Sequence, residues 1–140
     1  MKVMVMDGQG GGIGATVIKG LRAISGEALE IYGVGTNSAD TARMMKAGAN
    51  RGATGENAII HTSPKVEVII GPLAILMANA MMGEVTPAIA EAVAGASARK
   101  LLLPINQPHF EIIGIEWKAL TKQISAAIEV VRLALEDEVS

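Results

Sequence analysis

Five glycines within the seven positions Gly8–Gly14 constrain the fold of this chain more than any other feature. A short apolar run, residues 2–6, precedes them, and apolar residues recur at helical spacing from Ile13 to Ile24. This pattern is typical of a buried strand, a loop and a helix. Glycine permits positive φ and lets the backbone approach an anion closely. The N–H groups and dipole of the following helix start then favour negative charge, so the pattern predicts a phosphate-bearing ligand at the loop.

The loop does not follow either common phosphate-binding pattern. Its sixth position counted from Gly8 is Ile13, so it is not G-x-G-x-x-G, and no Gly-Lys-Ser/Thr follows for a P-loop. The alternative is a tight turn without a ligand, which needs only one or two glycines. Each further glycine in ordinary backbone conformation costs about 0.5–1 kcal/mol, which favours binding. The candidate binding residues here are Gly8, Gln9, Gly10, Gly11, Gly12, Ile13 and Gly14.

Asp7 directly precedes the loop and leaves its role open. A carboxylate beside a pyrophosphate repels it. The side chain could accept N–H groups of its own loop, bind a ribose or an amine, or hold a metal. An acid that caps the turn is the interpretation we favour.

Apolar runs and helical periodicity alternate along the rest of the chain, which is typical of an α/β domain with a mostly parallel sheet. We expect strands at residues 2–6, 30–34, 66–70, 100–105 and 110–115, and a turn at 50–52. We expect helices at residues 13–24, 38–47, 54–60, 73–82, 86–96 and 120–135. The connection between residues 105 and 110 is too short for a parallel crossover, so the last strand should be an antiparallel edge strand.

Length and composition bound the class of protein. The 140 residues are enough for one domain, 1–140, and 50% apolar with 19% charged residues excludes disorder. A net charge of −2 and only three aromatic residues argue against nucleic acid as a partner. No stretch reaches the roughly 20 apolar residues of a membrane span, and no targeting segment is visible. The chain has no cysteine, which fits a cytoplasmic protein.

Polar residues follow the expected strands where a ligand would lie in an open α/β sheet. Thr36 and Asn37 stand where nicotinamide-binding domains usually carry the acid that binds the ribose, so we assign them to the ribose of NAD or NADP. Gly71 and Asn106 follow two other strands, and Asn79 or Asn106 would hold a polar group of the second half of the ligand. A plain loop and helix entry is the alternative for Thr36 and Asn37.

No catalytic residue can be assigned, so a small enzyme and a ligand sensor both remain open. His61 and His109 are isolated in the sequence, and we expect no metal site. The five serines lack the context of a nucleophile elbow. Glu84 precedes Thr86-Pro87 and needs no role beyond the start of a helix.

The loop residues Gly8, Gly12, Ile13 and Gly14 form G-x-x-x-G-I-G, which resembles the cofactor loop of short-chain dehydrogenases. The resemblance ends near residue 35. Those enzymes usually have threonine in place of Asp7, and their Tyr-x-x-x-Lys pair is absent, because Thr36 stands four positions after the only tyrosine. We therefore do not expect their activity.

A second resemblance spans nearly the whole chain. The motifs that carry it are residues 7–14, 35–37, 52–58, 70–72, 83–87 and 103–106, in that order. Together they are similar to a bacterial family of short Rossmann-like proteins known only as a domain of unknown function. The resemblance implies a three-layer Rossmann-like fold and no established activity.

The expected helix at residues 73–82 is apolar on every side except at Asn79. A helix of this kind must be covered all round, and a sheet covers only one side. We therefore expect a homodimer built partly on this segment, with the helix at 86–96 as the competing cover. The alternative to nucleotide binding is accordingly a non-enzymatic, oligomeric interaction module.

Overall fold

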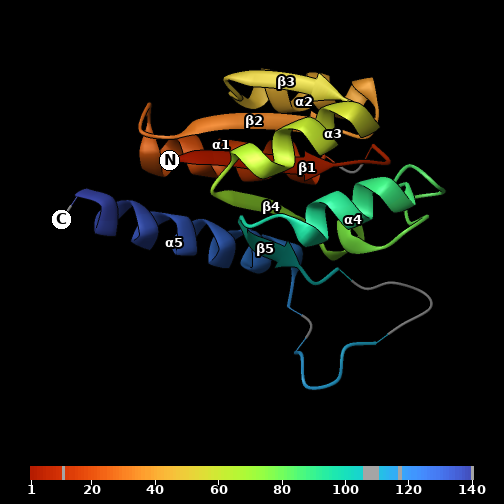
Figure 1. Cartoon of the computed structure of the whole chain (residues 1–140). Coiled ribbons are helices and arrows are strands. Elements are labelled where there is room, and N and C mark those ends of the chain that lie inside the picture. The colour runs from red at the N-terminus through yellow and green to blue at the C-terminus, as the bar shows by residue number, and fades with distance from the viewer. Residues whose placement is uncertain (11, 106–110, 117, 140) are drawn as a thin grey trace.

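A computed structural model describes residues 1–10, 12–105, 111–116 and 118–139. One sheet contains five strands, β1 (Lys2–Asp7), β2 (Glu30–Gly35), β3 (Arg51–Thr54), β4 (Val68–Pro72) and β5 (Arg99–Leu103). The helices are α1 (Ile13–Ser25), α2 (Ser38–Ala47), α3 (Glu56–Thr62), α4 (Pro87–Gly95) and α5 (Leu120–Val139), with short 3₁₀ turns at Ser63–Lys65 and Leu73–Leu76. The strand order is β3-β2-β1-β4-β5, and every pair is parallel (Figure 1). This is the strand order of a Rossmann-like sheet.

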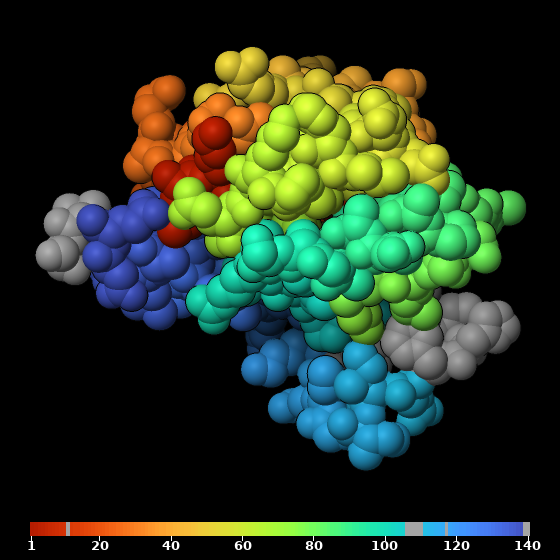
Figure 2. Space-filling view, in the orientation of Figure 1, coloured from red at the N-terminus to blue at the C-terminus, as the bar shows by residue number. Residues whose placement is uncertain are grey.

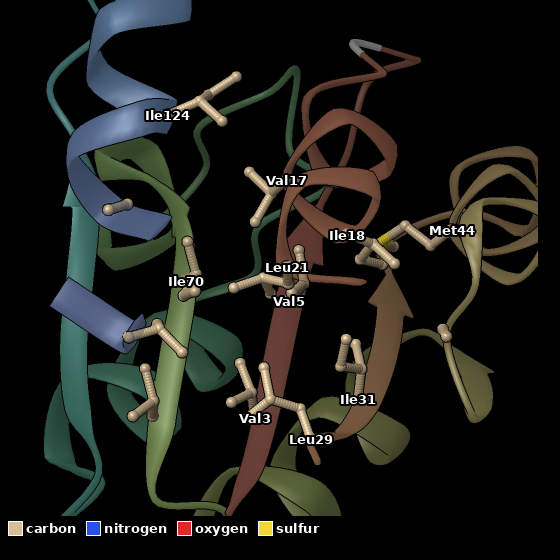
Figure 3. Close-up of a cluster of buried hydrophobic side chains, with 14 of the residues drawn as sticks. Val3, Val5, Val17, Ile18, Leu21, Leu29, Ile31, Met44, Ile70 and Ile124 are labelled. Carbon is tan, nitrogen blue, oxygen red and sulfur yellow. The ribbon is translucent and has the colours of Figure 1, made fainter. Parts of the chain in front are cut away.

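Alternation along the strands divides the core into two layers. Val3 and Val5 of β1 face the layer formed with α1, α2 and α5, which Figure 3 shows in close-up. Met4 and Met6 face the opposite layer, formed with α3 and α4. Successive side chains of a strand point to opposite faces, so β1 is buried on both sides, as its continuous apolar run predicts. The three-layer α/β prediction is confirmed.

The expected antiparallel edge strand is wrong. Within residues 111–116 the structure has no strand, and Phe110 lies outside the described residues. The strand that the sequence analysis missed is β3, which lies where we expected a turn at residues 50–52. Its sequence Arg-Gly-Ala-Thr is largely exposed at the sheet edge, so it lacks the apolar pattern by which a strand is recognised.

The expected helix at residues 73–82 is also wrong. Only Leu73–Leu76 form a 3₁₀ turn, and residues 77–85 form an irregular turn. Ala74 and Ile75 are buried, and Ile75 packs in the layer beneath α4, whereas Met82 is exposed. The apolar composition therefore belongs to a turn that is buried only in part, and the argument for a dimer from an all-apolar helix does not hold.

Two helix starts position the residues of the candidate site. The side chain of Thr86 accepts a hydrogen bond from the Ile89 N–H at 3.2 Å and Pro87 opens α4, as the sequence predicts. Asn37 caps α2 by accepting from the Asp40 N–H at 3.0 Å. In the part of the chain that the structure describes, no helix has both the length and the hydropathy to cross a bilayer.

Candidate functional site

The glycine loop leaves the central strand β1 at the carboxyl edge of the sheet. Connections turn in opposite directions on the two sides of β1, toward β2 and toward β4, which makes this edge the switch point where open α/β sheets bind ligands. Gly10 and Gly12 both have φ of +68°, and Gln9 has φ of +54°. A Cβ added at Gly12 would meet no atom within 4 Å, so the loop is open directly before the first turn of α1.

Asp7 caps the base of the loop. Its side chain is 2% exposed and accepts hydrogen bonds from the Gly8 N–H at 2.8 Å and the Gly14 N–H at 2.7 Å. Burial raises the pKa of this carboxyl, and the neighbouring Asp40 raises it further, while the backbone donors lower it. The capping interpretation of Asp7 is confirmed.

Asp40 of α2 holds the tip of the loop. This side chain is 1% exposed, and its Oδ2 accepts from the Gly10 N–H at 2.8 Å and from Asn37 Nδ2 at 2.6 Å. Its Oδ1 is buried without a hydrogen-bond partner among the described residues and lies 3.8 Å from Arg43 Nη1. The sequence offers no sign of this role, because an acid in the first turn of a helix is ordinary.

Glu84 reaches the loop from the connection between β4 and α4. Its Oε1 accepts from the Gln9 N–H at 2.9 Å, from Thr36 Oγ1 at 2.6 Å and from Asn37 Nδ2 at 2.9 Å. These donors, with the Thr36 hydroxyl foremost, lower the pKa of the Glu84 carboxyl. A carboxylate therefore stands beside Thr36 and Asn37 after all, supplied by another part of the chain.

The 77–85 turn that carries Glu84 has an unusual backbone. Asn79, Met81 and Met82 have φ of +67°, +56° and +55°, and Gly83 follows at +86°. Asparagine and glycine adopt this left-handed conformation readily, but for Met81 and Met82 it costs roughly 1–2 kcal/mol each. Met81 covers Gly8, since a Cβ added there would lie 2.7 Å from the Met81 sulfur. The turn thus closes over the switch point at the expense of backbone strain.

Arg43 brings the opposite charge. Its Nη1 donates to the Gly10 carbonyl at 2.8 Å, and half of its side chain is exposed. Nothing in the sequence marks Arg43 for this role, since it lies inside α2 and beyond the strand end. The guanidinium is long enough to reach back from α2 to the loop, a distance that sequence spacing does not reveal.

The structure brings most of the expected binding residues to one edge. Thr36 and Asn37 lie against the loop, and Ile13 begins α1 beside it. Gly71 lies one residue before the end of β4, but a Cβ there would lie 2.7 Å from the Met6 carbonyl, so close packing accounts for this glycine. Gly11 and Asn106 lie outside the described residues. Asn79 sits in the left-handed turn and is exposed.

Chemically, the loop presents a row of backbone N–H donors, and those with a hydrogen-bond partner donate to carboxylates of this chain. These are the N–H groups of Gly8, Gln9, Gly10 and Gly14. The space beside Gly12, at the first turn of α1, is open among the described residues. No residue of that first turn is acidic. Across the described ranges, no group of three or more histidine or acidic side chains is arranged to hold a metal ion.

A separate groove of about 560 Å³ lies between β5 and α5, away from the loop. Leu101, Leu103 and Val130 line its floor, and Lys100 and Lys122 stand among its polar residues. The polar groups that converge at the carboxyl edge are not part of it. We therefore place the candidate site at the glycine loop.

Comparisons with known proteins agree with this architecture. A family model described as a domain of unknown function (DUF3842) matches residues 2–136. Among solved structures, a dodecameric FMN-dependent Ubix-like decarboxylase from Escherichia coli O157:H7 is similar, with 16% identity and a TM-score of 0.50 over 93% of this chain and 75% of that one. The PbgP3 protein from Burkholderia pseudomallei has 12% identity and a TM-score of 0.45 over 96% of this chain and 52% of that one. At these identities the likeness concerns the fold alone. A comparison with curated proteins found no match.

Proposed function

This chain belongs to the DUF3842 family of domains of unknown function, and we propose that it binds a phosphate-bearing nucleotide or dinucleotide at the carboxyl edge of its sheet. The observation that carries the proposal is the Arg43 guanidinium, held 2.8 Å from the Gly10 carbonyl beside a glycine loop that is open at Gly12. The phosphate lies over Gly12 and the first turn of α1, with Arg43 as its cationic partner.

Three physical features support this placement. The N-terminal turn of α1 carries no acidic side chain of its own, and Asp7 takes its Gly14 N–H from the side of the core. The helix dipole still favours an anion on the open side at Gly12. Gly12 has a left-handed backbone and open space above it, which allows a close approach. Arg43 is half exposed, so its guanidinium can turn toward a phosphate with the planar geometry that arginine uses for this group.

The ligand class follows from the fold and the polar groups nearby. Thr36 and Asn37 lie beside the loop, and we propose that they contact a ribose or ribityl chain next to the phosphate, the role that the sequence predicts for NAD or NADP. The similar decarboxylase is described as FMN-dependent, so FMN joins the candidates. All three share the phosphate that Arg43 and α1 recognise. Catalysis remains open, because no side chain at this edge is assigned to a reaction.

Thermal unfolding and calorimetry with FMN, NAD and NADP test the proposal. A ligand at about 100 times its dissociation constant adds about 2.7 kcal/mol to stability, which raises the melting temperature of a chain of this size by several degrees. No shift with any of the three at millimolar concentration contradicts the proposal.

Two pairs of variants locate the site. Arg43→Ala should weaken binding about tenfold or more, since it removes a charge-assisted contact. Arg51→Ala is the control and should leave binding unchanged, because Arg51 begins β3 and its side chain pairs with Glu30 of β2. Gly12→Val should abolish binding. Gly26→Val is its matched control, because Gly26 also has positive φ and open space but lies at the far end of α1. If the two variants of either pair change the affinity equally, the ligand does not bind at the glycine loop.

The second candidate function is an oligomeric interaction module, favoured by exposed apolar side chains. Met82 is 92% exposed and Ile113 is 87% exposed, and Figure 2 shows the segment that contains Ile113 projecting from the body of the domain. The homodimer remains a prediction on this basis. Light scattering should give about twice the monomer mass of 14.5 kDa, and Met82→Ser or Ile113→Ser should shift it toward the monomer. A monomer mass for the unaltered chain at micromolar concentration refutes it.

A further inference from the structure

One oxygen atom is the meeting point of three donors at the candidate site. A backbone N–H (Gln9), a hydroxyl (Thr36) and a side-chain amide (Asn37) all donate to Glu84 Oε1, at 2.6 to 2.9 Å. The donors come from the glycine loop and from the end of β2. Convergence of this kind is how proteins bind an anionic oxygen.

We propose that these three donors form an anion subsite of the ligand, and that Glu84 fills it as an internal stand-in until the ligand displaces it. The proposal rests on the proposed function and describes how that site is regulated. The incoming group is an oxygen of the phosphate that lies over Gly12 and Arg43, on the side that faces the ribose or ribityl chain and therefore Thr36 and Asn37. Its arrival releases Glu84, and the 77–85 turn opens away from the switch point.

The conformation of the turn supports displacement. Three non-glycine residues, Asn79, Met81 and Met82, hold left-handed backbone while the turn is closed. Met82 gains no burial from this conformation, since 92% of its side chain is exposed. Val85 is fully buried and anchors the end of the turn, where its N–H donates to the Ala80 carbonyl at 3.2 Å. Opening therefore moves the part before Val85, relieves the strain at Met81 and Met82, and breaks the contacts of Glu84 and Met81 with the loop. Such strain persists where the surrounding structure imposes it and is common at ligand clamps and switches.

The position of the turn explains why it must move. Met81 packs over Gly8, and Glu84 takes the Gln9 N–H, so both lie on the loop that a phosphate would approach. An ionised carboxylate at this point repels a phosphate. The alternative role, in which Glu84 accepts ribose hydroxyls, would leave the turn closed on the ligand and require the carboxylate for binding. The two roles predict opposite effects of removing Glu84.

Removing the stand-in is the direct test. Glu84→Ala should bind FMN or NAD about tenfold more tightly than the unaltered chain, because the ligand no longer has to displace a carboxylate from the three donors. Tenfold corresponds to about 1.4 kcal/mol, and calorimetry at one salt concentration measures it. Glu91→Ala, an exposed acid on α4, is the matched control and should bind as the unaltered chain does. Should the alanine variant fail to fold, Glu84→Gln keeps an acceptor oxygen without the charge and should also bind more tightly.

Amide hydrogen exchange of the unaltered chain supplies the second readout. On addition of ligand, the amides of Gly83 and Glu84 should exchange faster, while the Gln9 amide stays protected by the ligand. Slower exchange throughout the turn shows that it closes on the ligand and overturns the proposal.

The failures can be told apart. Equal or weaker binding by Glu84→Ala overturns the stand-in role and leaves the proposed function intact, with weaker binding assigning Glu84 to the ligand's hydroxyls. Absence of binding by both chains, with FMN, NAD and inorganic pyrophosphate, refutes the proposed function and the displacement together.

Discussion

Replacing Asp40 with alanine removes the acceptor that holds the tip of the glycine loop. Two donors, the Gly10 N–H at 2.8 Å and Asn37 Nδ2 at 2.6 Å, lose the oxygen that they share on an almost fully buried side chain. A hydrogen bond to a charged group contributes about 1.5–3 kcal/mol, so the gross loss is roughly 3–6 kcal/mol.

Two gains offset part of this loss. The buried Oδ1, which has no hydrogen-bond partner among the described residues, disappears, and so does the repulsion between Asp40 and Asp7. We expect a net decrease of about 2–3 kcal/mol in the free energy of unfolding, which lowers the melting temperature by several degrees. The pKa of the Asp7 carboxyl should fall at the same time, because a neighbouring negative charge has been removed.

Urea unfolding followed by circular dichroism measures the stability, and a carboxyl NMR titration measures the pKa of Asp7. Glu91→Ala is the control, since an exposed acid on α4 should change stability by no more than about 0.5 kcal/mol. Asp40→Asn keeps one acceptor oxygen and should lose less than the alanine variant. A loss below about 1 kcal/mol for Asp40→Ala, or an unchanged pKa of Asp7, refutes the account of a loop held by this carboxylate.

Further predictions concern packing and pH. Gly33→Ala should destabilise the fold by about 1–3 kcal/mol in urea unfolding, because its Cβ would lie 2.7 Å from Met44 Cβ. Gly95→Ala should be neutral or stabilising, because its Cβ would meet no described atom within 4 Å. Similar effects of the two variants would contradict the packing argument. The pKa of Glu84 is lowered in the folded state from 4.5, so its contribution to stability is present above that pH and lost as the pH falls through the folded pKa. The stability difference between the unaltered chain and Glu84→Gln should therefore shrink in acid, and a constant difference would count against the Glu84 contacts. The pKa of Asp7 is raised from 3.8, so its contribution is full below that pH and declines as the pH rises through the folded pKa; an NMR midpoint below 3.8 would contradict this.

Local patterns predicted the parts of the fold that local forces determine. The buried run of β1, the glycine loop and the Thr86-Pro87 helix start were all recognisable, because burial and capping leave a mark on neighbouring residues. β3 escaped notice because an exposed edge strand carries no such mark. The 77–85 turn was mistaken for a helix from its apolar composition, although Asn79 and Gly83 are residues that tolerate left-handed backbone and could have indicated a turn.

The sequence predicts the backbone of the candidate site but not the side chains that contact it, because the first depends on local pattern and the second on contacts between distant parts of the chain. The loop and the strand ends can be read from the sequence, since parallel strands bring their carboxyl ends to one edge. The groups that contact the loop cannot, because Glu84 is 75 positions from Gln9 and 48 from Thr36 along the chain. Asp40 and Arg43 act through the reach of their side chains across the site. Tertiary placement, and not local pattern, assigns these roles.

The spread of the loop's partners along the chain sets an order of assembly. A chain emerging from the ribosome presents β1 and the glycine loop before β2 and α2, which supply Asp40. Glu84 follows only after β4 has been made, so the Gln9 N–H lacks its partner until 75 further residues exist. A truncated chain ending before this residue would carry the loop without its covering turn. The glycine loop is thus made well before it can reach its final set of contacts.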